Sequence, residues 1–206
     1  MRKDLFMSLR HQPKAALIND FSGFGRCSVT VALPIISQMK VQCCPVLTSV
    51  FSNHTGYPSF YFDDYTEKMP SYIAEWKKLN LHFECIAAGF LGSERQIEIV
   101  KNFIRDFKDE TTKVLIDPVM GDHGRTYQTF TPEMCSQMKQ LAHFADILTP
   151  NLTEACILTD TPYHDGHWQM SELSELALSL IAMGPSKVVI TGVSMGTFIG
   201  NVICES

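Results

Sequence analysis

The chain has 206 residues, a net charge of −5 and 19% charged side chains. A length of about 200 residues suits one domain, with a core large enough to need neither disulfides nor a structural metal. The negative charge excludes a strongly basic face of the kind that holds a nucleic-acid backbone. We therefore expect a single domain over residues 1–206 that binds no nucleic acid.

Cysteine use and hydropathy predict the compartment. The seven cysteines are an odd number, they form no Cys-x-x-Cys pair, and most of them lie in apolar runs. This pattern is typical of reduced thiols in a cytoplasmic protein. No apolar segment approaches the length that spans a bilayer. We therefore expect a cytoplasmic protein without a membrane partner.

Strands and helices alternate along the first half of the sequence. Short apolar runs that end in polar, Gly-containing loops predict strands, and apolar side chains at helical spacing predict the helices between them. The predicted elements are a strand at 15–18, a helix at 27–39, a strand at 41–50, a helix at 64–79 and a strand at 85–88.

The same alternation continues in the second half. Ser93 with Gln96 forms a capping box that begins a helix, and Thr131 with Pro132 supplies an N-cap and a first-turn proline for another. The other predicted elements are a strand at 114–116, a strand at 146–148, a helix that Asn151 opens, a helix that contains 173–181, a strand at 187–191, a turn at 192–196 and a strand at 197–204. Because so few residues separate the last two strands, we predict an antiparallel hairpin there.

Strands that alternate with helices predict a mostly parallel sheet with helices on both faces. Unusual polar and aromatic residues fall just past the carboxyl ends of the predicted strands. They are Asp20, Ser22, residues 53–55, Phe90, Asp117, Asp122, Asn151, Glu154 and Thr191. Ligands of open α/β sheets bind at this edge. The sequence therefore predicts that six separate loops form one binding site.

The strand at 114–116 runs directly into Asp-Pro-Val-Met-Gly-Asp, residues 117–122. Two carboxylates on one tight loop repel each other unless a cation lies between them, and a hydrated metal ion is a common solution. A helix cap and a turn aspartate would explain the same residues without any ligand. Asn151 and Glu154 likewise form a capping box, a role that can coexist with ordering metal-bound water.

Three familiar motifs are incomplete or missing. Gly23 and Gly25 lack the third glycine of a dinucleotide fingerprint, because Ser28 occupies its place. The sequence has no Gly-x-x-x-x-Gly-Lys-Ser/Thr, so a P-loop is excluded. Residues 164–167, His-Asp-Gly-His, have no third ligand nearby and predict a solvated loop rather than a metal centre.

Four motifs occur in a characteristic order. They are Phe-Ser-Asn-His-Thr-Gly-Tyr at 51–57, Asp-Pro-Val-Met-Gly-Asp at 117–122, Thr-Pro-Asn-Leu-Thr-Glu-Ala at 149–155 and Gly-Pro-Ser-Lys-Val-Val-Ile-Thr-Gly at 184–192. Together they resemble the vitamin B6 (pyridoxal, pyridoxine and pyridoxamine) kinases of the ribokinase-like superfamily, over nearly the whole chain from about Ala15. The resemblance implies a three-layer α/β ribokinase-like fold. It also implies ATP-dependent phosphorylation of the 5′-hydroxymethyl group of a vitamer.

The resemblance also implies how the loops share the work. The ring of the vitamer would contact Asp20, Ser22, Phe51, Thr55 and Phe90. Asp20 stands where many B6 kinases carry Ser, and Phe90 stands where many carry Tyr. The phosphates of ATP would contact Asp117, Tyr127, Thr149, Asn151 and Thr191, with Mg²⁺ near Asp122 and Glu154. Thr149 and Thr191 would contact phosphate or a monovalent cation.

Members of this superfamily carry a C-terminal Gly-Thr-Gly-Asp, whose amides bind an anion and whose Asp activates the attacking hydroxyl. This tetrapeptide does not occur in the sequence. We therefore expect that no residue present is the general base, that the base lies beyond Ser206, and that C-terminal helices are missing. The 206-residue chain is then a truncated ribokinase-like domain that is weakly active or inactive.

Other functions stay open. Asp-Phe-Ser-Gly at residues 20–23 is also similar to the hydroxymethylpyrimidine kinases, which phosphorylate a hydroxymethyl group on a different heteroaromatic ring. A non-catalytic fragment that only binds a vitamer or a partner protein is the second alternative. Similar kinases are dimers, and an exposed sheet edge would favour pairing, so we expect a homodimer.

Overall fold

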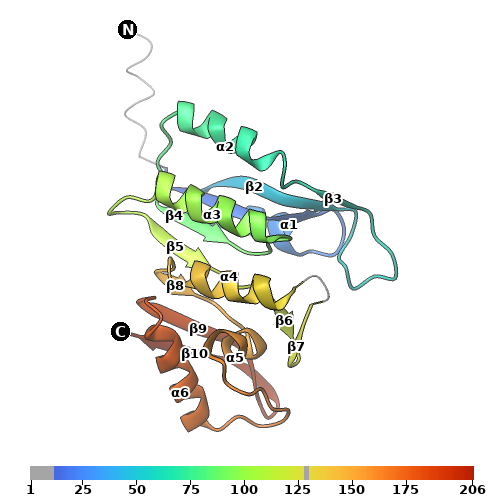
Figure 1. The fold of residues 1–206 in the computed structure, drawn as a ribbon, viewed down its shortest axis with the longest axis vertical. Helices are drawn as coiled ribbons and strands as arrows, with labels where there is room; N and C mark the ends of the chain where they lie inside the picture. Colours follow the sequence, from blue (N-terminus) through green and yellow to red (C-terminus); the bar gives the residue numbers. More distant parts are fainter. Residues whose placement is uncertain (1–11, 128–129) are drawn as a thin grey trace.

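The computed structural model describes residues 12–127 and 130–206 and forms a single α/β arrangement (Figure 1). The elements are β1 (Lys14–Ser22), α1 (Ser28–Gln38), β2 (Gln42–Phe51), β3 (Phe62–Asp64), α2 (Met69–Lys78), β4 (Cys85–Ala88), α3 (Glu94–Phe107), β5 (Lys113–Ile116), β6 (Gly121–Asp122), β7 (Arg125–Thr126), α4 (Pro132–Ala142), β8 (Ile147–Leu148), α5 (Leu152–Thr159), α6 (Met170–Ile181), β9 (Lys187–Met195) and β10 (Phe198–Glu205).

The main sheet has eight strands in the order β10-β9-β8-β5-β4-β1-β2-β3. The six inner strands pair in parallel, and the edge strands β3 and β10 pair antiparallel with their neighbours. This arrangement confirms the predicted mostly parallel sheet and the predicted final hairpin. In parallel strands all carboxyl ends meet at one edge, so the loops that follow them lie together.

The chain fills the sheet one half at a time. Strands β1 to β4 make one half, and β5, β8, β9 and β10 make the other. In Figure 1 the blue and green strands therefore lie on one side of the yellow and red ones. The halves join where β4 pairs with β5, from Cys85 opposite Lys113 to Ala88 opposite Ile116.

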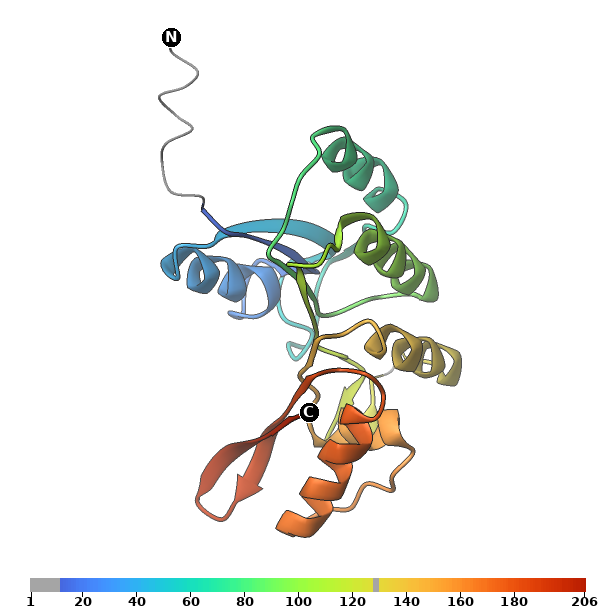
Figure 2. The ribbon, with the colours of Figure 1, turned by 90° about the vertical axis from the view of Figure 1, so that its left-hand side faces the viewer.

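Helices lie on both faces of the sheet, as predicted. Figure 2 shows α1 on one face and α2, α3 and α4 on the other. Helices α4, α5 and α6 contact one another in turn, and α6 packs on β9 and β10. Among the described elements, α1 is the only helix on its face. The helical layers are therefore unequal.

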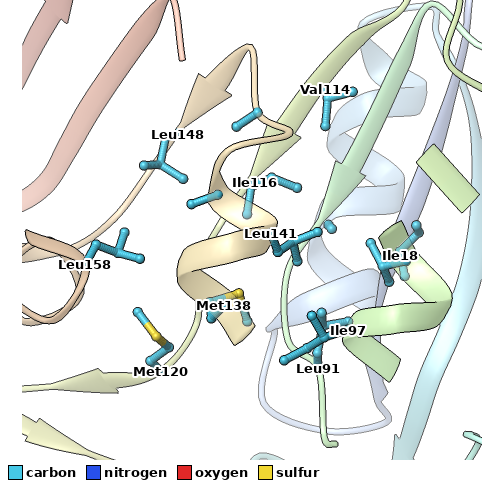
Figure 3. Close-up of a cluster of buried hydrophobic side chains, with 14 of the residues drawn as sticks. Ile18, Leu91, Ile97, Val114, Ile116, Met120, Met138, Leu141, Leu148 and Leu158 are labelled. Carbon is cyan, nitrogen blue, oxygen red and sulfur yellow. The ribbon is translucent and has the colours of Figure 1, made fainter. Parts of the chain in front are cut away.

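The main core lies between the sheet and the layer that contains α3 and α4 (Figure 3). Helix α3 turns one apolar side inward, including Ile97, which is fully buried in the same cluster as Ile18 and Ile116 of the sheet. Met138 and Leu141 of α4 are fully buried in the same cluster. Burying a side chain of this size contributes about 2 kcal/mol to the free energy of folding. Packing in this layer therefore stabilises the strands whose ends carry the loops of the site.

Local capping follows the sequence. The side chain of Thr131 accepts the N–H of Met134 at 3.2 Å, and Ser93 Oγ accepts the N–H of Gln96 at 3.2 Å. The Gln96 side chain differs from a full capping box, because it binds the amide of Gly92 at 2.7 Å. Helices α3 and α4 therefore begin where the sequence predicts, and the Gln96 side chain binds residues outside its own helix.

Three short strands were not predicted. β3 ends at Asp64, the first residue expected to be helical, and α2 begins only at Met69. β6 and β7 form a small hairpin inside the loop after β5. The turn predicted at 192–196 is wrong, because β9 continues to Met195. The pairing of β9 with β10 shifts register between Gly200 and Val202.

Two further observations concern the cysteines and the helices. The cysteines are free thiols, as expected from their pattern in the sequence. None of the helices within residues 12–127 and 130–206 combines the length and the apolar character of a membrane span.

Candidate active site at the carboxyl edge of the sheet

The loops that follow β1 and β2 are joined by their backbones. The N–H of Gly23 donates to the carbonyl of Phe51 at 3.0 Å, and the N–H of His54 donates to the carbonyl of Phe24 at 2.8 Å. Gly25 has a φ of 122°, and a Cβ there would lie 2.7 Å from the His54 Cβ. A side chain at position 25 would therefore separate the two loops.

Asp20 lies at the end of β1 and is only 6% exposed. Its carboxylate accepts hydrogen bonds from the hydroxyls of Ser22 at 3.0 Å and Ser28 at 2.6 Å. Ser28 has a φ of 54°, a conformation that costs energy for a residue with a side chain. The protein therefore holds this carboxylate at a fixed point beside the loops.

Phe90 is fixed by side chains at both of its backbone polar groups. Its N–H donates to Asn19 Oδ1 at 3.0 Å, and its carbonyl accepts the hydroxyl of Thr48 at 3.0 Å. Its ring packs edge-on against Phe51, with 6.0 Å between the ring centres. Phe51 also packs against Phe60 and Phe62, at 5.7 and 4.9 Å. These rings form an aromatic wall beside Asp20 that suits a flat heteroaromatic ligand.

Gln96 holds the segments that carry this wall together. Its side chain is fully buried and links three segments of chain. Oε1 accepts the N–H of Gly92, whereas Nε2 contacts the carbonyl of Thr48 at 2.8 Å, Thr66 Oγ1 at 2.8 Å and an oxygen of Asp64 at 3.2 Å. The loop that carries Phe90 is thereby tied to β2 and β3.

On the other half of the sheet, the start of α5 holds the loop after β5. Asn151 Nδ2 donates to the carbonyl of Gly121 at 2.9 Å, and the hydroxyl of Thr153 accepts the N–H of Gly124 at 2.8 Å. The carboxylate of Glu154 accepts the N–H of Met120 at 3.2 Å and that of Asn151 at 2.8 Å. The capping box of α5 therefore also fixes the position of hairpin β6–β7.

The acidic groups here carry unusual pKa values. Burial raises the pKa of Asp117 from 3.8 to about 6, and its carboxylate has no hydrogen-bond donor among the described residues. Burial also raises the pKa of Glu154 to about 8, and the nearby Asp117 adds to the shift. Burial raises the pKa of Tyr127 too, followed by the charges of Asp122, Glu154 and Asp117. The site therefore concentrates negative charge that a cation would relieve.

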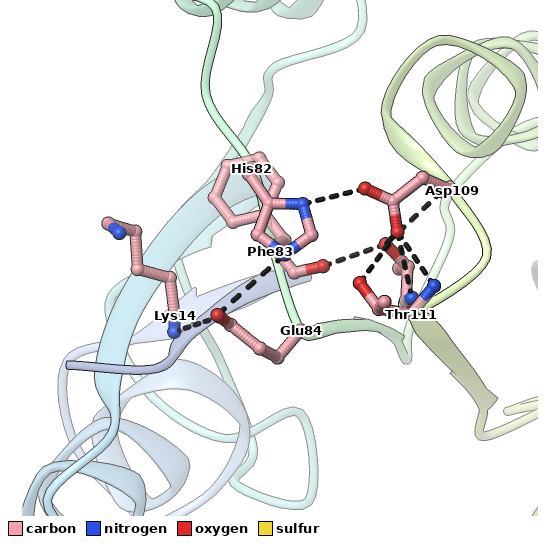
Figure 4. Close-up of polar contacts among 7 residues, drawn as sticks. Lys14, His82, Phe83, Glu84, Asp109 and Thr111 are labelled. Atoms are coloured by element: carbon pink, nitrogen blue, oxygen red, sulfur yellow. Dashed lines mark hydrogen bonds and ion pairs between the residues drawn. The ribbon is translucent and has the colours of Figure 1, made fainter. Parts of the chain in front are cut away.

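The opposite edge of the sheet behaves differently (Figure 4). Asp109 Oδ2 lies 2.8 Å from His82 Nδ1, and Oδ1 accepts hydrogen bonds from Thr111 and Thr112. These donors lower the pKa of Asp109 to about 2. Glu84 Oε2 accepts the N–H of Lys14 at 2.6 Å. The carboxylates of Asp109 and Glu84 thus accept hydrogen bonds from protein groups, whereas the carboxylate of Asp117 at the carboxyl edge accepts none from the described residues.

A family model described as phosphomethylpyrimidine kinase matches residues 33–205, which is most of the chain. The chain belongs to this kinase family. A pyridoxal kinase of Arabidopsis thaliana is 31% identical over 161 residues, which is 74% of this chain and 49% of that protein. The chain thus spans about half the length of the curated relatives it matches.

Solved structures agree with this assignment. A putative phosphomethylpyrimidine kinase from Bacteroides thetaiotaomicron is 45% identical, with a TM-score of 0.92 over 97% of this chain and 69% of that chain. A second crystal form, solved with pyridoxal, is 48% identical, with a TM-score of 0.86 over 90% of this chain and 64% of that chain. The predicted pyridoxal kinase-like, ribokinase-like fold is confirmed.

The acidic half of the site in this kinase family member fits a hydrated magnesium ion. No group of three or more His, Cys, Asp or Glu in residues 12–127 and 130–206 is arranged to enclose a metal. Magnesium keeps several waters and usually takes one or two carboxylates together with substrate phosphates. Asp117, whose carboxylate receives no hydrogen bond from the described residues, and the exposed Asp122 of the same loop supply two such carboxylates.

The structure brings most of the predicted site residues to one edge. The aromatic wall contains Phe51 and Phe90, and Asp20 and Ser22 lie near the end of the neighbouring strand β1. Thr55 is exposed on its loop and makes no side-chain hydrogen bond with the described residues. Asp117, Asp122, Tyr127, Asn151 and Glu154 gather at the hairpin. Thr149 follows β8. Thr191 was predicted just past the end of a strand, but it lies within β9, because that strand continues to Met195. The hydroxyls of both threonines make only long contacts of 3.4 Å to backbone carbonyls. The roles of these residues stay predictions.

Sequence reasoning missed several residues whose hydrogen bonds hold the loops of the candidate site in place. Asn19, Ser28, Thr48 and Gln96 contact the loops that carry the predicted ring residues. Asn19 could have been found, because it directly precedes Asp20 at a strand end. Gln96 was recognised only as part of a capping box with Ser93. Its buried side chain binds the amide of Gly92 instead of completing that box. Thr48 lies inside a strand and had no signal.

Proposed function

We propose that the chain carries the ring pocket and the metal–phosphate half of an ATP-dependent kinase for the 5′-hydroxymethyl group of a vitamin B6 vitamer. The observation that carries this proposal is the contact between the two halves of the site. The N–H of Asp117, which begins the acidic loop, donates to the carbonyl of Ala88 at 2.8 Å, two residues before Phe90. A ring on the aromatic wall would therefore lie beside phosphates at Asp117.

The proposal assigns each half a task. Asp20, Ser22, Phe51, Thr55 and Phe90 bind the ring, and the buried carboxylate of Asp20 orients it. Asp117, Tyr127, Thr149, Asn151 and Thr191 bind the nucleotide phosphates, and Asp122 and Glu154 are nearest to Mg²⁺. When bound, Mg²⁺ neutralises charge on the phosphoryl group that moves. A monovalent cation beside Thr149 and Thr191 is part of the same proposal.

Hydroxymethylpyrimidine is the alternative substrate. The name of the matching family model and the Asp-Phe-Ser-Gly loop at residues 20–23 favour it. Both rings are flat and carry a hydroxymethyl group, so the aromatic wall alone does not separate them. The pyridoxal complex of the 48% identical relative favours the B6 vitamer.

Calorimetric titration of the 206-residue chain with pyridoxal and with hydroxymethylpyrimidine tests the substrate. We expect pyridoxal to bind at least about tenfold more tightly, a difference of about 1.4 kcal/mol. Tighter binding of the pyrimidine would select the alternative kinase. Binding of neither ring would contradict the proposed function altogether, and pyridoxal binding without any response to MgATP would favour the non-catalytic fragment.

Turnover tests the position of the base. With MgATP and pyridoxal, we expect the 206-residue chain to be weakly active or inactive, because no residue at the described site is a good base. Asp117 is better explained as a phosphate or metal partner, and the oxygens of Glu154 accept backbone amides. A steady-state rate comparable with that of a full-length kinase would contradict this placement.

Asp20→Asn is expected to lower the preference for pyridoxamine over pyridoxal about tenfold, because the negative carboxylate attracts an amine. The serine hydroxyls that hold Asp20 can rotate to suit an amide, so the variant should fold. Dissociation constants for both vitamers measure the ratio. Glu110→Gln, which removes one exposed charge at the opposite edge, is the control. An unchanged ratio in Asp20→Asn would show that its charge does not select the vitamer.

The proposed assembly is a homodimer in the cytoplasm. Edge strand β10 exposes Phe198 and Ile199, at 76% and 81%, and an open edge of this kind favours pairing. Analytical ultracentrifugation of the purified chain would measure its oligomeric state.

A further inference from the structure

Cationic side chains are scarce at the carboxyl edge. The loops that follow the parallel strands contain Arg26 and Arg125 and no lysine. The same loops and strand ends carry Asp20, Asp117 and Asp122. Nucleotide phosphates carry several negative charges, so a site that binds them benefits from a fixed positive group of the protein. Either arginine could supply it, and their positions differ.

Arg125 lies in a hairpin whose geometry is tightly defined. It pairs with Asp122 across the two strands, and His123 and Gly124 form the turn with φ values of 50° and 72°. A Cβ on Gly121 would lie 2.2 Å from the carbonyl oxygen of Arg125, so the strands approach closely. Because the start of α5 holds this hairpin, the backbone of Arg125 has a fixed place beside the acidic loop.

The hairpin turns one side toward the acids. Arg125 and Asp122 are cross-strand partners, and side chains opposite each other on paired strands lie on the same side. The N–H of Tyr127 donates to the carbonyl of Met120 at 2.9 Å, so the pairing continues one residue beyond β7. Side chains two residues apart on an extended strand point to the same side. Arg125 therefore projects from the side of the hairpin that carries Tyr127.

Among the residues that the structure describes, the guanidinium of Arg125 has no hydrogen-bond or ion-pair partner. The arginines of α3 do have partners, since Arg95 pairs with Glu67 and Arg105 binds Asn102. Within residues 12–127 and 130–206, no hydrogen bond or ion pair involves the exposed Arg125 side chain, although Asp122 is its cross-strand neighbour. A free, planar set of five donors suits a phosphate group that it can bind with two hydrogen bonds.

We propose that Arg125 is a further nucleotide-binding residue, whose guanidinium binds the outer phosphates of ATP from hairpin β6–β7. The inference rests on the proposed function, because it uses the same phosphate half of the site. It adds the positive group that the acidic loop lacks. Asp117 and Asp122 would face the metal side of the phosphates, and Arg125 would face the phosphate oxygens.

Binding of magnesium tripolyphosphate and of MgATP to the 206-residue chain tests the proposal. Tripolyphosphate has no adenine, so its affinity reports on the phosphate contacts alone. We expect Arg125→Gln to weaken both ligands about tenfold or more, and Arg125→Lys to recover part of the loss because it keeps the charge but not the planar donor set. Pyridoxal affinity and the melting temperature should not change, since no hydrogen bond or ion pair joins the Arg125 side chain to the other described residues.

Two control variants separate a contact from a general charge effect. Arg105→Gln, on the exposed side of α3, should leave both affinities unchanged. Arg26→Gln removes the other arginine of the same edge and should have a clearly smaller effect than Arg125→Gln. An equal loss of affinity in Arg26→Gln and Arg125→Gln would overturn the assignment, because it would show that the phosphates respond only to the total positive charge of this edge and not to a contact with Arg125.

The remaining outcomes distinguish the two proposals. If the unmodified chain binds tripolyphosphate and Arg125→Gln binds it equally well, the role of Arg125 is overturned while the proposed function stands. If the unmodified chain binds pyridoxal but neither phosphate ligand, both Arg125 and the nucleotide half of the proposed function are overturned.

Discussion

Asp117→Asn is expected to stabilise the ligand-free protein and, at the same time, to weaken its binding of magnesium nucleotide by about 100-fold. Asp117 is half-buried, and its carboxylate is largely withdrawn from water and receives no hydrogen bond from the described residues. Its charge is therefore costly until a cation arrives. A neutral amide avoids this cost, but it cannot bind the metal side of the phosphates equally well.

The stability effect has a defined pH window. The pKa of Asp117 is about 6 in the folded protein and 3.8 in a model peptide. Between these pH values the folded state binds more protons than the unfolded state, so the free energy of unfolding falls as the pH rises. The loss is on the order of 3 kcal/mol and is nearly complete by pH 7. Asp117→Asn lacks this loss and should be more stable at pH 7.

Thermal unfolding of both proteins between pH 4 and 8, without and with MgATP, measures the two effects. Glu110→Gln makes the same change of charge at an exposed site and should alter neither. A melting temperature of Asp117→Asn below that of the unmodified chain at pH 7 would contradict the account of an unpaired buried charge. Retained MgATP affinity would remove Asp117 from the nucleotide site.

Gln96→Leu is expected to lower the free energy of unfolding by about 3 kcal/mol. Leucine is similar in size, so the core keeps its volume. The variant instead leaves the N–H of Gly92 and the carbonyl of Thr48 without their buried partner. Unpaired buried groups cost more than the net contribution of the original hydrogen bonds.

The same variant should weaken pyridoxal binding, because Gln96 ties the loop of Phe90 to β2. Chemical denaturation measures the stability, and titration at a temperature where the variant is folded measures the affinity. Gln38→Leu is the control, since Gln38 is exposed at the end of α1 and its side chain makes no hydrogen bond within the described chain. A variant as stable as the unmodified protein would show that Thr48 and Gly92 find other partners.

Features set by neighbouring residues were predictable from the sequence. Caps at Thr131 and Asn151 need only residues within one helical turn, and β4 was predicted with its bounds because an apolar run ends at a glycine. β3 and hairpin β6–β7 were missed because strands of two or three residues show no alternation. The His123-Gly124 turn was the available signal, since its residues adopt positive φ.

The candidate site divides in the same way. Residues at the ends of strands, such as Asp20 and Asp117, could be gathered from the topology of parallel sheets alone. The contacts of Asn19 with Phe90 and of Gln96 with Thr48 join residues 71 and 48 positions apart. No local pattern specifies such pairs, because they depend on how separate strands align.

The division of the sheet into consecutive halves suggests how specificity could diversify in this family. The aromatic wall belongs to the strands of the first half, and the acidic loops belong to the second, with one strand pair between them. If the two halves have the roles proposed above, substitutions in the first half would change the ring that is bound and would leave the residues proposed to bind phosphate in place.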